Sequence, residues 1–240
     1  MADDVRTGVK ALVFDVFGTV VDWRGSLLRE LASFGHERGI AADWEAFTDD
    51  WRRGYQPAMQ RVRCGELPWC KIDELHRMIL DVLLAKYRIG GLSEAEIDHL
   101  NRAWHRLDPW PDAVAGLTRL KRRYVIGTLS NGNMALLVNM AKRAGLPWDV
   151  VLSAELAHHY KPDPQAYLMP PELLGLKPSQ VMLVAAHPGD LAAAAEQGLR
   201  TGYVARPLEW GPKGKPHEVA AGTFDVTAGD FNQLAERLGA

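Results

Sequence analysis

Eight side chains that could do chemistry fall into four groups, and each group follows an apolar run of the sequence. In chain order the groups are Asp15 with Thr19, Ser130 with Asn131, Lys161 with Tyr167, and His187 with Asp190. A carboxylate near a lysine can be kept ionised and act as a nucleophile, while hydroxyl and amide groups can bind an anion. One such group alone could be a helix cap or a turn, but four in this order are hard to obtain by chance.

Five apolar runs rich in β-branched residues predict the strands that must position these groups. They span residues 9–15, 124–130, 149–153, 181–186 and 201–205. Continuous rather than alternating apolar character is typical of strands covered on both faces, as in a parallel sheet. Helical patterns at 111–123, 133–145, 164–175 and 190–199 separate the later runs. This order predicts an α/β fold with a doubly wound, mostly parallel, Rossmann-like sheet, which binds ligands beyond the carboxyl ends of its strands.

The stretch between the first two strands breaks this rhythm. Its helical patterns, at 26–39, 43–62, 71–88 and 93–106, leave no convincing strand, so we expect an inserted α-helical cap domain at residues 22–106. Residues 1–21 and 107–240 would then form the Rossmann-like core domain. A Gly- and Pro-rich stretch at 206–222 is interpreted as a surface loop before a final helix at 229–239.

Composition excludes several classes of partner. Of the 240 residues 47% are hydrophobic, which is enough for a substantial core, and the formal net charge of −2 argues against binding to nucleic acid or an anionic membrane. No apolar stretch approaches the roughly 20 residues of a membrane span, and the polar N-terminus lacks the layout of a secretory signal. Cys64 and Cys70 do not suggest a disulfide framework. We therefore expect a cytoplasmic protein that binds neither nucleic acid nor membrane.

The four groups also carry a resemblance to a known family. The motifs FDVFGT, LSNG, YKPDPQAY and AAHPGD, with a helical insertion after the first, resemble those of the haloacid dehalogenase superfamily over nearly the whole chain. The resemblance implies a Rossmann-like sheet and makes Asp15, the Asp of the first motif, the nucleophile.

Position 17 separates two branches of that family. Most members are phosphatases, in which a second Asp two residues after the nucleophile protonates the leaving alcohol and an acidic pair helps to hold magnesium. Here Phe17 stands at that position, and AAHPGD offers one carboxylate, Asp190. A halide needs no proton to leave, so these departures match the (S)-2-haloacid dehalogenase (type II) branch. That branch implies attack of Asp15 on C2 of a 2-haloalkanoic acid, an aspartyl ester, and hydrolysis to the 2-hydroxy acid with inversion, without metal or other cofactor.

The resemblance implies roles for the residues around Asp15. Thr19 would fix the rotamer of the carboxylate and Lys161 would keep it ionised, although a helix cap and a surface lysine are the alternatives. Ser130 and Asn131 would bind the substrate carboxylate at a helix start, unless SNGN is only a turn.

The pocket wall is also expected from the resemblance. Arg52 of the cap, which follows a Trp, would cradle the departing halide, with Arg53 or a solvated arginine as the alternative readings. Phe17 would line a dry pocket. Tyr167 matches the family's KP…Y pattern, and packing at the start of a helix explains it almost as well.

The fourth motif departs most from the family pattern, which commonly shows Ser-Ser-Asn followed two residues later by Asp. Two alanines and His187 stand in place of Ser-Ser-Asn, so no role carries over for the alanines. Asp190 would orient Lys161 or the hydrolytic water, and His187 could act as base or positioner for that water. A buried His that donates to a backbone carbonyl is the alternative, and the group that activates the water stays open.

Two other classes of function compete with a dehalogenase. The first is a magnesium-dependent phosphatase or phosphonate hydrolase of a small metabolite. The second is a non-catalytic binding module, against which the joint presence of Asp15, Ser130, Lys161 and Asp190 argues. The expected ligand is a small 2-haloacid, including fluoroacetate if the halide pocket suits fluoride, and a homodimer is expected from the resemblance alone.

Overall fold

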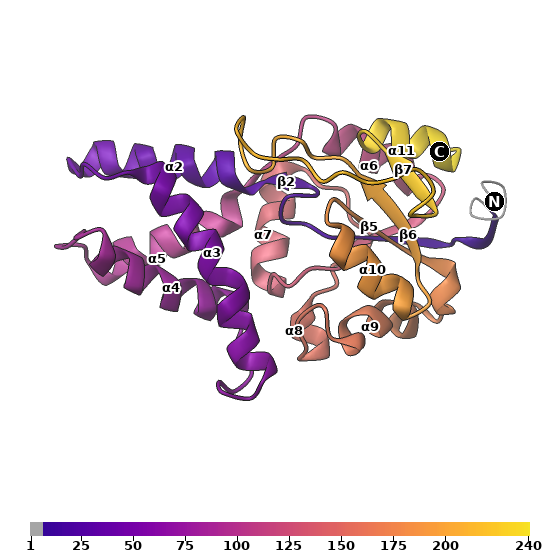
Figure 1. Ribbon diagram of the computed structural model, residues 1–240, viewed down its shortest axis with the longest axis horizontal. Helices are drawn as coiled ribbons and strands as arrows, with labels where there is room; N and C mark the ends of the chain where they lie inside the picture. The colour runs from indigo at the N-terminus through magenta and orange to yellow at the C-terminus, as the bar shows by residue number, and fades with distance from the viewer. Residues whose placement is uncertain (1–6) are drawn as a thin grey trace.

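The computed structural model describes residues 7–240 (Figure 1). Its central sheet has five strands in the order β4-β1-β5-β6-β7, and all neighbouring strands run parallel. The strands are β1 (Ala11–Phe14), β4 (Val125–Thr128), β5 (Val181–Ala185), β6 (Arg200–Val204) and β7 (Val226–Ala228). The predicted α/β class with a mostly parallel sheet is therefore confirmed.

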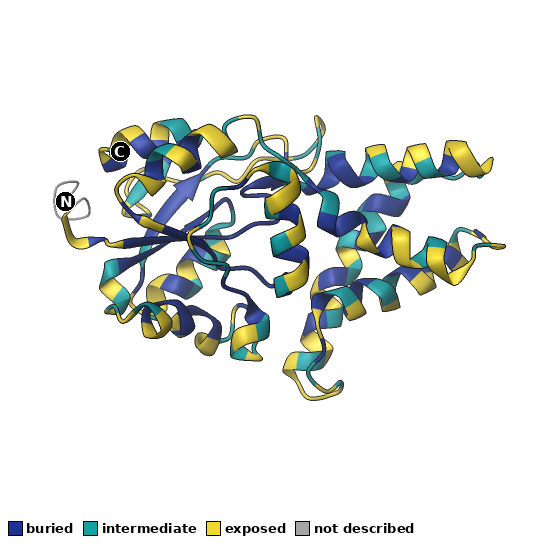
Figure 2. Cartoon of the chain, turned by 180° about the vertical axis from the view of Figure 1, so that it is seen from behind, coloured by how far each residue is buried: buried dark blue, intermediate teal, exposed yellow. Residues whose placement is uncertain are grey.

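Strand β1 shows why its sequence is apolar without alternation. Leu12 and Phe14 are buried in one cluster with residues of α6 (Ala113–Lys121) and α11 (Phe231–Leu238). Ala11 and Val13 are buried in a second cluster with residues of α9 (Pro164–Leu174) and α10 (Pro188–Glu196). Helices thus cover both faces of the sheet, and Figure 2 shows buried strands between helices whose outer faces are exposed.

A group of helices lies beyond one side of the sheet (Figure 1). They are α2 (Trp23–Arg38), α3 (Trp44–Arg63), α4 (Ile72–Lys86), α5 (Glu94–Asn101) and the 3-10 helix η1 (Arg102–Arg106). Their connections to the sheet run side by side, because β2 (Val21–Asp22) pairs antiparallel with β3 (Asp108–Pro109). The pairing of these two connections supports the predicted division into a core domain and a cap domain at residues 22–106. The division itself stays a prediction.

The remaining elements are α7 (Met134–Ala144), α8 (Ala154–Ala157) and the 3-10 helix η2 (Pro178–Gln180). Every helix expected from the sequence forms within a few residues of its predicted bounds, except that the stretch 93–106 divides into α5 and η1. Within the described part of the chain, none of the helices has the length and apolar character needed to cross a membrane.

The strand predicted at residues 149–153 is not formed. This stretch makes only isolated bridges to β4 and the residues just after it. Its backbone still bonds to β4, from the Asp149 N–H to the carbonyl of Ile126 at 2.9 Å and from the Thr128 N–H to the carbonyl of Val150 at 3.3 Å. Side chains make further bonds: the Asp149 carboxylate accepts from the N–H of Ile126 at 3.0 Å, and the Thr128 hydroxyl donates to the carbonyl of Leu152 at 2.7 Å. The prediction was wrong because β-like composition indicates a segment that lies beside a strand but does not reveal whether its backbone will pair regularly along its whole length.

The C-terminal tail is more than the expected surface loop. It ends in β7, a strand that the sequence did not reveal, and it is anchored by Arg206. The Arg206 guanidinium donates to both carboxylate oxygens of Asp112 at 2.7 and 2.9 Å, and its Nε donates to the carbonyl of Thr19 at 2.8 Å. The two side chains are only 6% and 13% exposed, so this buried ion pair ties the tail to the start of α6, and the bond to Thr19 ties it to the loop after β1.

Replacing Arg206 by Met is expected to lower the free energy of unfolding by about 3 kcal/mol, because Asp112 would remain buried without its partner. Urea unfolding followed by tryptophan fluorescence measures this change. Arg122→Met, at the exposed end of α6, is the control and should change the free energy by less than about 0.5 kcal/mol. Equal losses in the two variants would contradict the anchoring role of Arg206.

Candidate active site

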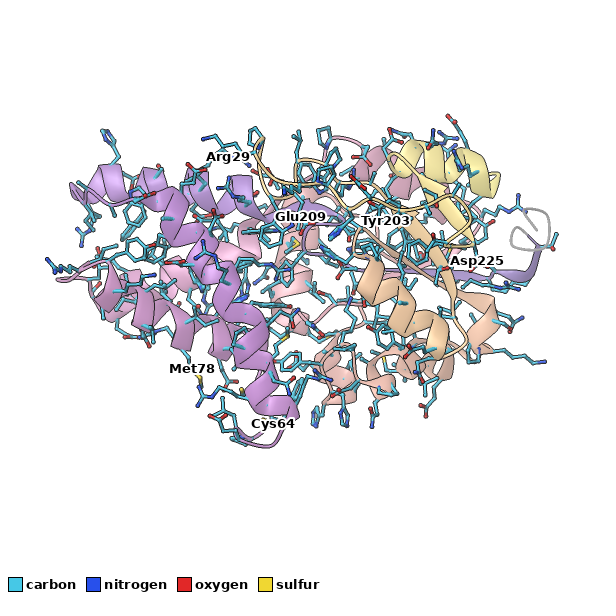
Figure 3. The ribbon with its side chains drawn as sticks, in the orientation of Figure 1. Arg29, Cys64, Met78, Tyr203, Glu209 and Asp225 are labelled. Atoms are coloured by element: carbon cyan, nitrogen blue, oxygen red, sulfur yellow. The ribbon has the colours of Figure 1, made fainter. Side chains whose placement is uncertain are left out.

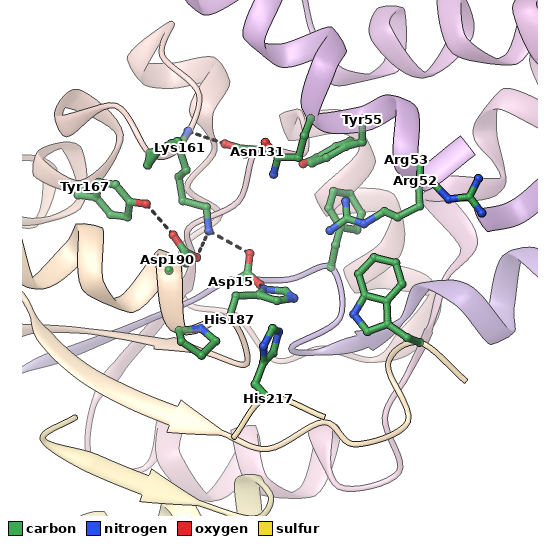
Figure 4. Close-up of a pocket in the computed structure, with 16 residues that line it drawn as sticks. Asp15, Arg52, Arg53, Tyr55, Asn131, Lys161, Tyr167, His187, Asp190 and His217 are labelled. Carbon is green, nitrogen blue, oxygen red and sulfur yellow. Dashed lines mark hydrogen bonds and ion pairs between the residues drawn. The ribbon is translucent and has the colours of Figure 1, made fainter. Parts of the chain in front are cut away.

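Asp15 lies at the carboxyl edge of the sheet, immediately after β1. Its backbone N–H still donates to the carbonyl of Val184 in β5 at 3.0 Å, and the residue is only 7% exposed. Oδ1 accepts from Lys161 Nζ at 2.9 Å (Figure 4), and Oδ2 accepts from the Thr19 hydroxyl at 2.7 Å. His187 Nδ1 lies 3.0 Å from the same Oδ2 atom. Both carboxylate oxygens are therefore fixed by groups from other parts of the chain.

The electrostatic surroundings keep Asp15 ionised. Burial by itself would raise the pKa of Asp15, but the Lys161 ammonium and the His187 ring outweigh burial and hold the pKa well below its usual range. The pKa of Lys161 is displaced upward for the matching reason, since Asp15 and Asp190 outweigh the effect of burial. At neutral pH the site holds a carboxylate and an ammonium in contact.

Lys161 connects the third motif to the other three. Its Nζ also donates to Asp190, whose other oxygen accepts from the Tyr167 hydroxyl at 2.7 Å (Figure 4). Its backbone N–H donates to the side-chain oxygen of Asn131 at 2.8 Å. Desolvation and the Asp190 charge both raise the pKa of Tyr167, so this phenol stays protonated and donates. Tyr167 therefore does more than pack at the start of α9, because it fixes one oxygen of Asp190.

His187 is held on both sides by carboxylates. Beyond its contact with Asp15, its Nε2 lies 2.9 and 3.0 Å from the two carboxylate oxygens of Glu209. Burial opposes a charged ring, but the hydrogen bonds and charges of Asp15 and Glu209 prevail and raise the pKa of His187 to about 10. The ring is thus an imidazolium at neutral pH, rather than a buried His that bonds to a backbone carbonyl.

One wall of the site is aromatic and includes an arginine that has a hydrogen-bond donor without a partner among the described residues. Phe17 is 3% exposed, and its ring centroid lies 5.6 Å from that of Trp104 and 6.2 Å from that of Tyr55. The guanidinium carbon of Arg52 lies 4.4 Å from the ring centroid of Tyr55. Arg52 Nη1 is buried and has no hydrogen-bond partner among the described residues. Such a donor next to a cavity favours an anion.

These side chains surround a cavity of about 630 Å³. Its walls include eight of the ten residues expected from the sequence to bind or react, namely Asp15, Phe17, Arg52, Asn131, Lys161, Tyr167, His187 and Asp190. Thr19 and Ser130 are not among the described residues that line it. Thr19 reaches the site through Asp15 and accepts from the N–H of Ala186 at 2.9 Å, whereas the Ser130 hydroxyl accepts from the N–H of Gly132 at 3.1 Å.

The residues present do not fit the magnesium ion that phosphatases of the resembling family use. Asp15 and Asp190 both direct an oxygen at Lys161 Nζ, so an ammonium already fills the space between the two carboxylates. Across residues 7–240, no group of three or more His, Cys, Asp or Glu side chains is arranged to hold a metal ion. A hard divalent cation needs several free oxygen ligands, which these carboxylates do not offer.

The residues of the site that were not expected from the sequence include Glu209, Trp210 and His217. All three come from the tail interpreted as a surface loop, and Trp210 and His217 line the cavity. Glu209 is 1% exposed and also accepts from the indole N–H of Trp23 at 3.2 Å. The only local signal was the Gly- and Pro-rich composition, which does not indicate that a charged residue will be buried.

Comparison with known proteins agrees with the geometry. The family model of haloacid dehalogenase-like hydrolases matches residues 9–198. The chain belongs to this family. A curated relative, (S)-2-haloacid dehalogenase 4A from Burkholderia cepacia, is 31% identical over 84% of this chain and 83% of its own length.

Two crystal structures are more similar to this chain still. A defluorinating L-2-haloacid dehalogenase is 46% identical, with a TM-score of 0.94 over 97% of this chain and 96% of its own. Another L-2-haloacid dehalogenase is 47% identical, with a TM-score of 0.90 over 96% of this chain and 100% of its own. The predicted resemblance to this family and to its 2-haloacid dehalogenases is confirmed, while the roles of the individual site residues stay predictions.

The raised pKa of His187 predicts a pH-dependent contribution to stability. A group whose pKa rises on folding stabilises the folded state fully below its ordinary pKa of about 6.5, and this contribution is lost as the pH rises through about 10. One pKa unit is worth about 1.4 kcal/mol, so wild type should lose more than that relative to His187→Asn over this range. Urea unfolding of both proteins at several pH values measures the difference. A difference that is constant with pH would mean that the ring is neutral.

Proposed function

We propose that this chain hydrolyses short 2-haloalkanoic acids, such as haloacetates and (S)-2-haloacids, to 2-hydroxy acids. The observation that carries the proposal is the buried, ionised Asp15 in a cavity where Phe17 stands two residues further on. The site thus has a nucleophile but no acid at the position from which phosphatases of this family protonate a leaving alcohol. The relatives described as (S)-2-haloacid and L-2-haloacid dehalogenases support the same reaction.

The first step is a displacement at C2 of the acid. An oxygen of Asp15 attacks C2 from the side opposite the halogen, the C–O bond forms, and the carbon–halogen bond breaks with its electron pair on the halide. Lys161 and Thr19 hold the carboxylate in one orientation for this in-line attack. Attack from behind inverts C2, and later hydrolysis at the carboxyl carbon of Asp15 leaves that configuration unchanged.

The departing halide and the substrate carboxylate need separate positive sites. Arg52 suits the halide, because its guanidinium has a buried donor to spare and lies against the aromatic wall that contains Phe17. Asn131 suits the substrate carboxylate, because it lines the cavity and its side-chain amide N–H groups can donate to an anion. Ser130 would support this second site through the turn, because its hydroxyl bonds to the N–H of Gly132.

The second step adds water to the ester. The water oxygen attacks the carboxyl carbon of Asp15 and the 2-hydroxy acid leaves, so a base must take one proton and an acid must return one. His187 and Asp190 both lie at the cavity and are the candidates. Asp190 already accepts from Lys161 and Tyr167, so its role is to hold the lysine.

Which halides the enzyme can release depends on the size of the halide site. The structure with a TM-score of 0.94 to this chain is that of a defluorinating enzyme, so fluoroacetate belongs among the substrates to be tested. A phosphatase or phosphonate hydrolase is less well supported, because Lys161 fills the space between Asp15 and Asp190. The expected homodimer and cytoplasmic location stay predictions.

Replacing Asp15 by Asn is expected to abolish halide release from chloroacetate and (S)-2-chloropropionate, because the nucleophilic carboxylate is lost. The assay measures free chloride with EDTA present. Asp98→Asn, a half-exposed carboxylate of α5, should release chloride at the wild-type rate. Wild type that releases no chloride but turns over a phosphoester when magnesium is added would overturn the proposal in favour of a phosphatase.

Replacing Arg52 by Met is expected to lower kcat/KM for chloroacetate by about 100-fold, because the guanidinium stabilises the charge that develops on the halide. Arg53→Met is the matched control, since its side chain is 67% exposed and paired with Asp50. Chloride release at several substrate concentrations gives both constants. A larger loss in Arg53→Met than in Arg52→Met would assign the halide to the neighbouring arginine.

A further inference from the structure

Glu209 lies on the side of His187 opposite the nucleophile Asp15, and several contacts fix its carboxylate. Its carboxylate contacts His187 Nε2 through both oxygens, at 2.9 and 3.0 Å, and one of these oxygens accepts from Trp23 Nε1 at 3.2 Å. A Cβ atom on Gly18 would lie 2.2 Å from the same oxygen, so the carboxylate packs directly on the glycine. Figure 3 places Glu209 where the helical part of the chain meets the sheet.

The backbone of Glu209 is fixed as firmly as its side chain. Its N–H donates to the carbonyl of Arg206 at 3.1 Å, and Arg206 is in turn locked by Asp112 and by the carbonyl of Thr19. A buried carboxylate held this way is costly unless its partner is cationic. His187 supplies that cation, so Glu209 and Asp15 share one imidazolium.

The first step of the proposed reaction removes one of these two anions. When Asp15 becomes an ester, its negative charge is gone, and the Nδ1–H of His187 then faces an uncharged oxygen. Glu209 still holds Nε2 and still carries its charge. Only after the ester has formed, therefore, does one ring nitrogen face a negative charge while the other does not.

We propose that Glu209 is a positioning residue for ester hydrolysis: it keeps the proton on Nε2 of His187, so that esterification of Asp15 releases the Nδ1 proton and leaves Nδ1 as the base for the hydrolytic water. This inference rests on the proposed dehalogenase function. Formation of the ester on Asp15 is thus the event that converts His187 into a base.

The protons balance over the cycle. The imidazolium gives its Nδ1 proton to solvent once Asp15 is esterified, and neutral His187 then takes a proton from the attacking water. The same Nδ1 returns that proton to the leaving oxygen of the 2-hydroxy acid. Asp15 is left as a carboxylic acid, and its proton passes to Nδ1, which restores the resting pair.

The groups around His187 are consistent with this sequence. Asp15 faces Nδ1, Glu209 faces Nε2, and the ring of the exposed His217 lies 6.1 Å away, centroid to centroid, from the tail side. Asp190, in the first turn of the helix that follows His187, is occupied by Lys161 and Tyr167. His217 also lines the cavity.

The test separates the two steps in single-turnover experiments with chloroacetate and enzyme in excess. Glu209→Gln keeps the shape of the side chain but loses its charge, so chloride release should stay within about twofold of wild type, while ester hydrolysis should slow by about 100-fold. Rapid quenching and intact mass measurement follow the ester on Asp15. Glu218→Gln, an exposed carboxylate of the same tail, is the control and should match wild type in both steps.

A second measurement uses wild type alone and does not depend on the folding of a variant. A pH indicator should show one proton released together with chloride, before the 2-hydroxy acid appears. In His187→Asn the proton should instead accompany the 2-hydroxy acid.

The outcomes separate the inference from the function. Wild type that releases no chloride overturns the proposed function and the inference with it. Chloride release without ester accumulation in Glu209→Gln, or a wild-type proton that appears only with the 2-hydroxy acid, overturns the inference and leaves the function standing.

Discussion

A carboxylate buried at the end of a parallel strand is stable as an anion only if cations and donors from elsewhere in the chain surround it, and Asp15 imposes this requirement on the whole fold. Lys161 meets it from one side and His187 from the other, with the Thr19 hydroxyl between them. Because β1 is flanked by β4 and β5, the loops that carry these groups all leave the same edge of the sheet. Parallel topology is thus what brings them to one carboxylate.

The same arrangement explains why the site suits displacement of a halide rather than transfer of a phosphoryl group. An ammonium between two carboxylates stabilises the nucleophile but leaves no room for a divalent cation. Phe17 and the aromatic rings beside it exclude water from the face where Arg52 presents its unused donor. A dry wall of this kind strengthens the attraction between the guanidinium and a developing halide charge.

The C-terminal tail completes the charge balance. Lys161 and His187 bring two positive charges to Asp15. Asp190 balances part of this charge, because it also contacts Lys161. Glu209 takes up the rest from behind His187, and the Arg206–Asp112 pair keeps the tail in the place where it can do so. A segment that connects the last strands of the sheet is therefore part of the site's electrostatics.

The elements that could be predicted from the sequence are those whose causes are local. The apolar runs gave the parallel sheet, the helical periodicities gave nearly every helix, and the motif that starts at Phe14 identified Asp15 and the absence of an acid at position 17. These features depend on residues that are neighbours along the chain, so periodicity and composition record them. The strand expected at residues 149–153 did not form for the opposite reason. How regularly its backbone pairs with β4 depends on residues that are distant in the chain, and the side chains of Asp149 and Thr128 make some of the bonds between the two segments.

Which charged groups come into contact depends on the tertiary structure. His187 and Asp15 are 172 residues apart in the chain, and the charge of His187 depends on Glu209, which lies in a loop of unremarkable composition. Whether a glutamate is buried, and against which partner, depends on how separate elements pack, and no local pattern encodes that. The identity of the nucleophile could therefore be predicted from sequence, whereas the protonation state of the groups that serve it followed from the fold.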